Sequence, residues 1–238
     1  MKKNRTGIKW PRLYKGTLIK RYKRFLADVE LDTGEMVTAH CANSGSMQTC
    51  SEPGRTVYLS FHDNPKRKLK YTWELIEMEH SLVGVNTGIP NKLVKTSIET
   101  GMVQELSMYS TVKPEVKVGD HSRIDLLLTD DKGEKCFVEV KNCTLVHDKT
   151  ATFPDAVTTR GLKHLVELQA QIKKGHRCVM FYLIQRMDAD LFRPADTIDP
   201  DYGKELRKAC RKGVEILAYD VDISLSEIVL NRPVPFEL

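Results

Sequence analysis

The sequence predicts two domains of different fold class: a small β-barrel over residues 1–86 and an α/β domain over residues 87–238. Two observations support this division. In the first part, short runs of alternating apolar and polar residues are separated by turn signals, as expected of half-buried strands. After the sequence TGIP at 87–90, segments with helical periodicity alternate with apolar strands, which is typical of an α/β layer arrangement. A chain of 238 residues is long enough for both domains.

The first domain is predicted to contain about five short strands. In the run FLADVEL at 25–31, one face carries an apolar residue at every second position, and the DTG that follows is a turn signal. A loop rich in Ser and Gly at 43–54 separates the second strand from the third. Short strands without a helix fit a barrel of the OB type, which often binds single-stranded nucleic acid or oligosaccharide. The predicted strands are 25–31, 36–42, 56–62, 71–78 and 81–86.

The second domain is predicted to begin with a helix. Asn91 can serve as its N-cap, and Val94 and Ile98 begin an apolar stripe along residues 92–107. The run RCVMFYLIQR at 177–186 is apolar between its polar ends, which indicates a central strand buried on both faces. The order of the segments describes an α/β sandwich. Further strands are expected at 114–119, 123–129, 136–142 and 214–221, further helices at 160–174 and 201–212, and an irregular segment at 147–159.

The composition is ordinary for a soluble globular protein, with 41% hydrophobic and 29% charged residues. The N-terminal sequence MKKNRTGIKW is basic but has no apolar run behind it, so it does not resemble a secretory signal. The longest apolar runs, such as CVMFYLI at 178–184, are too short to span a bilayer. We therefore expect a cytoplasmic protein with no membrane partner. The six cysteines form no CxxC pair, which argues against a structural zinc site and fits reduced thiols.

The net charge of +5 is concentrated in the first domain. Residues 1–80 carry 15 Lys and Arg against 9 Asp and Glu, whereas the remainder carries 22 against 23. Two basic clusters, KRYKR at 20–24 and KRKLK at 66–70, lie beside aromatic residues such as Tyr22 and Trp73. Phosphate contacts combined with stacking aromatics predict sequence-tolerant DNA binding, and a solvated lysine-rich surface is the alternative. The predicted contacts are Lys20, Arg21, Lys23, Arg24, Lys66, Arg67, Lys68 and Lys70.

Two carboxylates and a lysine are predicted to converge on neighbouring strands. Asp125 interrupts an otherwise apolar strand, and Glu139 and Lys141 share one face of the next strand. A turn at DDKG, centred on residue 132, places Asp125 opposite Glu139. Two carboxylates this close repel one another unless a cation lies between them, and Mg²⁺ or Mn²⁺ meets that need. Lys141 would then orient or deprotonate a water, or stabilise charge on a phosphate, in metal-dependent phosphodiester cleavage. A solvent-facing stripe is the alternative.

Asp125 followed by the string EVK at 139–141, with flanking helices, resembles the core of the PD-(D/E)xK nucleases. The sequence departs from that pattern at Ile124, where the motif has a proline. The resemblance implies a further glutamate from the preceding helix. Glu105 is the preferred candidate and Glu99 the second, with a solvent-edge glutamate as the alternative.

The start of the helix predicted at 160–174 is dense in polar groups. Because a helix N-terminus attracts phosphate, Arg160 and Lys163 are added to the predicted DNA contacts. His164 could donate a proton to a leaving group, and Gln169 could face the same site. A capped helix start with solvated side chains is the alternative.

A more specific resemblance extends along the whole chain. It is carried by the strings LIKRYKRFLADV, HCANSGSM, SRIDLLL, VEVKNCTL, FPDAVTTRGLKHLVEL and GVEILAY. Together they resemble the sugar fermentation stimulation protein family. The resemblance implies an OB-like domain, a nuclease-like domain and DNA binding, and the family's name implies a regulatory link to maltose metabolism. Two functions stay open: a metal-dependent deoxyribonuclease, and a non-catalytic DNA-binding regulatory factor. A carbohydrate-binding barrel is a third reading, which no Trp-rich groove supports.

Overall fold

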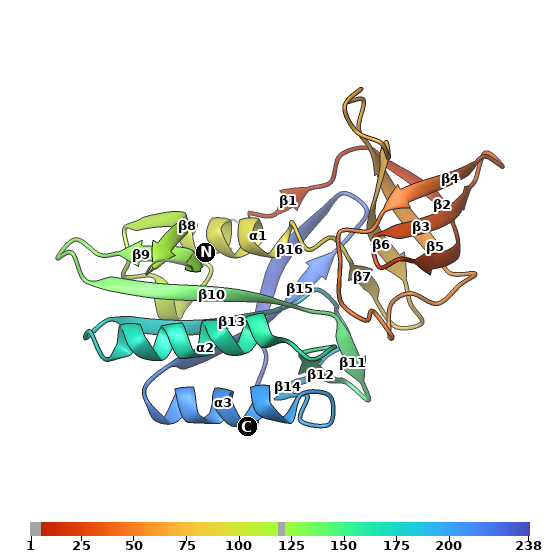
Figure 1. The fold of residues 1–238 in the computed structure, drawn as a ribbon. Coiled ribbons are helices and arrows are strands. Elements are labelled where there is room, and N and C mark those ends of the chain that lie inside the picture. The colour runs from red at the N-terminus through yellow and green to blue at the C-terminus, as the bar shows by residue number, and fades with distance from the viewer. Residues whose placement is uncertain (1–5, 119–121) are drawn as a thin grey trace.

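The computed structural model describes residues 6–118 and 122–238, which form two lobes (Figure 1). The red and orange strands of the first lobe form a barrel, and the second lobe combines a long sheet with helices on both faces. This arrangement confirms the predicted fold class of an N-terminal OB-like barrel followed by a C-terminal α/β domain. Within the described ranges, no helix is both long and apolar enough to cross a membrane.

The barrel is formed by β2 (Leu13–Tyr22), β3 (Leu26–Leu31), β4 (Met36–His40), β5 (Thr56–Phe61) and β6 (Tyr71–Glu77). It closes because β4 pairs with β3 on one side and with β6 on the other, which removes the free edges. β2 was not predicted as a strand, because its basic residues obscure the alternation of apolar and polar positions. The strand predicted at 81–86 does not close the barrel but extends the sheet beyond β6 as β7 (Leu82–Gly84).

The interior of the barrel explains the alternation seen in the sequence. Leu18, Val29, Leu59 and Trp73 are completely buried and pack together. Their neighbours along each strand face the outside or the second domain, since successive side chains of a strand point to opposite faces.

A seven-stranded mixed sheet forms the centre of the second domain. Its strands follow the order β1 (Ile8–Lys9), β16 (Glu227–Pro233), β15 (Glu215–Ile223), β13 (Arg177–Ile184), β10 (Lys135–Cys143), β9 (Ser122–Thr129) and β8 (Thr111–Val118). The strand predicted to be central, β13, runs parallel to both β10 and β15. It is buried from Cys178 to Ile184, as its continuous apolar run requires.

Helices cover both faces of this sheet. Helix α1 (Pro90–Glu99) packs on the face that carries Val138 and Val140 of β10. Helices α2 (Thr159–Ile172) and α3 (Pro200–Arg211) cover the opposite face (Figure 1).

The first helix of this domain is shorter than predicted. It ends at Glu99, because Gly101 with a φ of +70° turns the chain out of the helix, and a separate 3₁₀ helix follows at Gln104–Leu106. Asn91 is not its N-cap. Ile89 holds that position and Pro90 follows it, as is common at the first helical residue.

The segment predicted to be irregular instead contributes to a small three-stranded sheet. Its strands are β11 (Leu145–His147), β12 (Thr150–Phe153) and β14 (Leu191–Pro194). Asp148 and Lys149 form the two-residue turn between β11 and β12 with positive φ at both positions. That turn type usually carries Asn-Gly or Asp-Gly, so a hairpin could not be predicted at Asp148 and Lys149.

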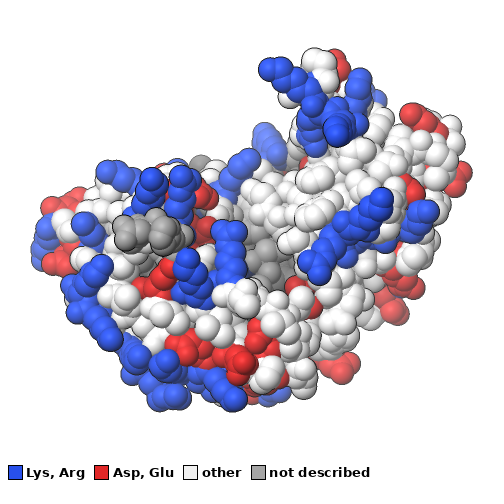
Figure 2. Space-filling view, in the orientation of Figure 1, with Lys and Arg blue, Asp and Glu red and all other residues white. Residues whose placement is uncertain are grey.

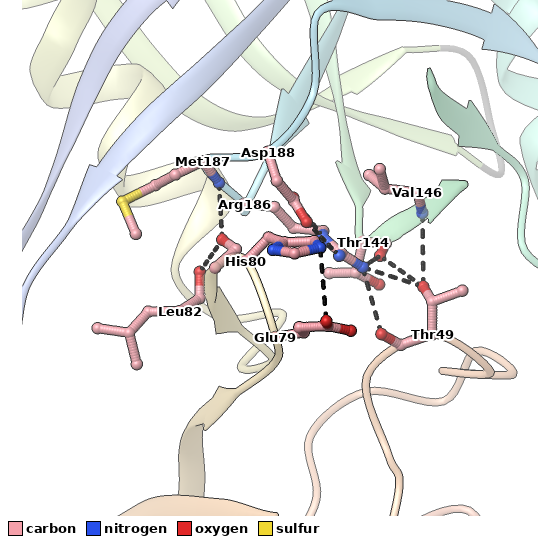
Figure 3. A network of polar contacts seen from close by, with 10 residues as sticks. Thr49, Glu79, His80, Leu82, Thr144, Val146, Arg186, Met187 and Asp188 are labelled. Atoms are coloured by element: carbon pink, nitrogen blue, oxygen red, sulfur yellow. Dashed lines mark hydrogen bonds and ion pairs between the residues drawn. The ribbon is translucent and has the colours of Figure 1, made fainter. Parts of the chain in front are cut away.

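A buried arginine joins the two lobes (Figure 3). The guanidinium of Arg186 donates to both oxygens of Asp188 and to the carbonyl of Thr144 in the second domain. It also donates to the carbonyl and the hydroxyl of Thr49, at 3.2 and 3.1 Å, in the barrel's long loop. The predicted domain boundary between residues 86 and 87 stays a prediction.

Candidate metal and nucleic-acid site

The predicted hairpin of β9 and β10 has the register expected from the sequence. Thr129 pairs with Lys135 and Leu126 with Val138, so the next facing positions are Asp125 and Glu139. The ladder ends at that point, and Oδ2 of Asp125 accepts a hydrogen bond of 2.8 Å from the backbone N–H of Val140. The Asp125 carboxylate therefore lies against the backbone between Glu139 and Lys141.

Glu139 forms the buried centre of a polar cluster. Its side chain is 1% exposed, and its Oε1 accepts a hydrogen bond of 2.7 Å from Nζ of Lys141. The same oxygen contacts Nδ1 of His164, which reaches the site from α2. Nζ of Lys141 lies 3.0 Å from that ring nitrogen. The structure thus brings Glu139, Lys141 and His164 into direct contact.

The two carboxylates differ in their electrostatic environment. Burial and the neighbouring Glu139 raise the pKa of Asp125 to about 6, although the Val140 N–H, Lys141 and Asn91 oppose the shift. Burial also disfavours charge on Glu139, but the hydrogen bond from His164 and the charge of Lys141 outweigh it and hold its pKa below the usual value. The pair therefore combines a firmly ionised glutamate with an aspartate whose negative charge is only partly compensated by Lys141.

The chemistry of this pair fits a divalent cation that prefers oxygen ligands. Within the described residues, Oε2 of Glu139 is buried without a hydrogen-bond partner, although Oε1 is fully engaged. A buried carboxylate oxygen without a partner is costly unless a ligand satisfies it. No group of three or more His, Cys, Asp or Glu side chains that could enclose a metal occurs among the described residues. Mg²⁺ commonly binds through one or two carboxylates plus waters and substrate phosphates, so Asp125 and Glu139 suffice for that mode.

The structure does not bring Glu105 to this cluster. Glu105 lies on the 3₁₀ helix, and its Oε2 accepts from the Tyr219 hydroxyl at 2.8 Å. The second candidate, Glu99, is at the end of α1 and pairs with Lys95. Gln169 is also turned away, because its side-chain amide donates to Glu205 on α3.

Asn91 is the residue of α1 that does reach the site. Its side-chain amide donates to Oδ1 of Asp125 at 2.8 Å and holds the carboxylate in place. From the sequence, Asn91 was expected to cap the helix and not to reach the site. The one sequence signal for the observed placement is Pro90. Proline prefers the first helical position, which places Asn91 inside the helix and not at its cap.

The two basic clusters lie at one end of the barrel. The strand register pairs Leu26 with His40 and His40 with Thr72, so β4 connects the β2–β3 turn to the loop before β6. Figure 2 shows Lys and Arg side chains on the protruding tip of the barrel and on both sides of the hollow between the lobes. The exposed residues among the predicted DNA contacts are Lys20, Lys23, Arg24, Lys66, Lys68, Lys70, Arg160 and Lys163.

Arg21 has a structural role in the folded chain. Its guanidinium donates to the carbonyls of Asn43, Gly45 and Ser46 at 2.8–3.1 Å. Arg67 is half-buried and donates to the hydroxyl of Thr72. Arg21 therefore anchors a loop, which its place in a basic cluster did not indicate.

Fold and site together define a class of protein: an OB-like barrel joined to an α/β domain with a carboxylate–lysine cluster on adjacent strands. Family models match both parts. Residues 19–85 match the SfsA N-terminal OB domain, and residues 88–227 match the sugar fermentation stimulation protein RE domain. The chain belongs to the sugar fermentation stimulation protein family.

Several proteins are similar to this chain over nearly its whole length. A sugar fermentation stimulation protein homolog of Geotalea uraniireducens is 55% identical, over a match that covers 89% of this chain and 91% of the homolog. The homolog of Geobacter sulfurreducens is 54% identical, over a match that covers 94% of this chain and 95% of that homolog. The solved structure of Pyrococcus furiosus SfsA in complex with Ca²⁺ superimposes with a TM-score of 0.88 at 27% identity, and covers 97% of this chain and 98% of that one.

Proposed function

We propose that this protein binds DNA without sequence preference and hydrolyses its phosphodiester bonds with Mg²⁺ or Mn²⁺. The observation that carries the proposal is the unpartnered, buried Oε2 of Glu139 beside the Asp125 carboxylate, with Lys141 in contact. The Ca²⁺ in the Pyrococcus furiosus structure supports a divalent cation in this fold. When bound, the cation would polarise the phosphate and lower the pKa of a water.

The protein groups around the carboxylates have distinct roles in this proposal. Asp125 and Glu139 hold the cation, and Asn91 fixes the aspartate by its hydrogen bond. Lys141 carries a positive charge that orients the attacking water or stabilises charge on the phosphate. His164 contacts both Glu139 and Lys141. In this proposal its role is to position the lysine ammonium, and it does not contact the substrate directly.

The distribution of charge supports the choice of DNA as substrate. Lysines and arginines lie on the protruding tip of the barrel and on both sides of the hollow between the lobes (Figure 2). The start of α2 also carries two exposed basic residues, Arg160 and Lys163. A phosphate backbone in that hollow would neutralise several of these basic residues at once, whatever its base sequence.

One observation favours a second candidate function. Lys141 and His164 both contact Oε1 of Glu139, so part of the carboxylate charge is already balanced without a metal. This pairing fits a DNA-binding regulatory factor, linked to sugar metabolism by the family's name, that keeps a nuclease-like fold without cutting.

A cleavage assay separates the two candidates. Duplex, nicked, tailed and single-stranded DNA are incubated with the protein and Mn²⁺, Mg²⁺ or EDTA. The nuclease proposal predicts metal-dependent cleavage that falls at least about a hundredfold in Asp125→Asn and Glu139→Gln. Asp131→Asn, on the exposed turn of the same hairpin, serves as the matched control and keeps its activity. DNA binding by the wild type without cleavage on any substrate would favour the regulatory factor.

A further inference from the structure

A cavity of about 520 Å³ opens between the two domains next to the carboxylate cluster. One wall is the barrel loop 43–46, and the opposite wall is the segment 153–158 that leads into α2. Asn142, near the end of β10, and Thr144, just after it, also line the cavity, so the cavity begins one residue beyond Lys141. Its volume is in the range of about 300–1,000 Å³ that is typical of small-ligand sites.

The loop that forms the barrel wall is held in place before any ligand arrives. Arg21 donates to three of its carbonyls, and Oδ1 of Asn43 accepts the N–H of Gly45 at 2.8 Å. Gly45 lies directly against Asp155, where a Cβ atom would come within 2.3 Å of a carboxylate oxygen. Asp155 in turn accepts the N–H of Met47 at 3.2 Å. A preformed wall lowers the entropic cost of binding.

The lining of the cavity combines amide, apolar, hydroxyl and charged groups, and its charged groups include the Asp155 carboxylate as well as arginines. Asn43 and Asn142 supply amides, and the oxygen of Asn142 is already occupied by Gln185, which leaves its amide nitrogen as a donor. Apolar surface comes from Phe153 and from Val157, which is 74% exposed. The exposed cation Arg24 lies at the rim. A nucleotide has the matching parts: a flat base, polar base edges and a phosphate.

We propose that this cavity receives an unpaired nucleotide of the DNA strand that crosses the carboxylate site. The inference rests on the proposed function and adds the substrate class, which is DNA with a single-stranded end. A base inside a continuous duplex must first be unpaired and unstacked to enter, whereas a base in a single-stranded tail enters without that cost. The protein therefore selects tailed over blunt duplexes.

Binding of labelled duplexes in Ca²⁺ tests this selection. The duplexes share one sequence and end either blunt, in a 3′ tail or in a 5′ tail. We expect the wild type to bind at least one tailed form about tenfold or more tightly than the blunt form. Ala156→Trp and Ser44→Trp, which fill the cavity from opposite walls at exposed positions, should reduce that ratio to about one and leave blunt-end affinity unchanged. Ala170→Trp, an exposed alanine on α2 outside the cavity, should keep the wild-type ratio.

The outcomes separate this inference from the proposed function. Equal affinity of the wild type for all ends, or an unchanged ratio in both cavity-filling variants, overturns the nucleotide cavity but leaves DNA binding intact. Failure of the wild type to bind any of these DNAs overturns both. Circular dichroism of the two tryptophan variants shows that a changed ratio does not come from unfolding.

Discussion

At the scale of single residues, the site depends on how unevenly its charges are compensated. Glu139 is paired directly with Lys141 and His164, whereas among the described residues the hydrogen bonds to Asp125 come from Asn91 and a backbone N–H. A buried carboxylate whose charge is incompletely compensated is unfavourable, and a bound cation would relieve that cost.

The substitution Asp125→Asn tests this imbalance in metal-free buffer. Because the pKa of Asp125 is raised to about 6, the folded protein binds more protons than the unfolded chain between about pH 4 and 6. Its stability therefore falls as the pH rises through that window and stays reduced above it. We expect Asp125→Asn to be more stable by about 1–2 kcal/mol at pH 8 in EDTA, with the gain lost near pH 4. Urea unfolding at both pH values measures this, and a gain that does not depend on pH would contradict it.

A second prediction separates the two roles found inside one basic cluster. Arg21→Ala removes the donors from three loop carbonyls and should lower the free energy of unfolding by about 1–3 kcal/mol. Lys23→Ala, two residues further along and exposed, should change it by less than about 0.5 kcal/mol. Equal urea midpoints for the two variants would show that the loop does not depend on Arg21.

At the scale of the elements, most helices and strands could be predicted from hydrophobic periodicity and from turn residues. The DDKG turn fixed the register of β9 and β10, and with it the facing positions of Asp125 and Glu139. The three-stranded sheet could not be predicted, because the turn at Asp148 and Lys149 lacks the usual glycine and because β14 comes from a distant segment. The prediction that Glu105 joins the site was wrong for a related reason. The helix that was expected to carry Glu105 ends before it, because Gly101 turns the chain out of the helix.

The hydrogen bonds of Arg186, which link the two lobes, predict a large loss of stability when this residue is replaced. Arg186 is buried and joins the barrel loop at Thr49 to the second domain. Arg186→Ala leaves Asp188 without its cation and removes the donor to the carbonyls of Thr49 and Thr144, so it should lower stability by about 3–5 kcal/mol. The control Arg193→Ala breaks a half-exposed pair with Glu237 and should cost less than about 1 kcal/mol. Similar losses in both variants, measured by urea unfolding, would contradict a special role for Arg186.

At the scale of the whole molecule, the excess positive charge that the sequence placed in the first domain lies on the barrel tip and beside the hollow (Figure 2). Lys66 and Lys68 are exposed there. If each neutralises one phosphate, the double variant Lys66→Ala/Lys68→Ala should reduce the slope of log K against log salt by about 2. Lys204→Ala, on α3 beside Asp201, should leave the slope unchanged. Fluorescence anisotropy at several salt concentrations measures it, and an unaltered slope in the double variant would exclude both lysines from the DNA path.

The central claim is that Asp125 and Glu139 bind one divalent cation between them. Anomalous diffraction from crystals soaked in Mn²⁺ tests it without reference to activity. We predict one strong peak about 2.1 Å from a carboxylate oxygen of each residue, with Oε2 of Glu139 as the ligand that is unpartnered in the metal-free chain. A map without a peak there, in which Lys141 and His164 still enclose Glu139 at saturating Mn²⁺, would contradict the claim.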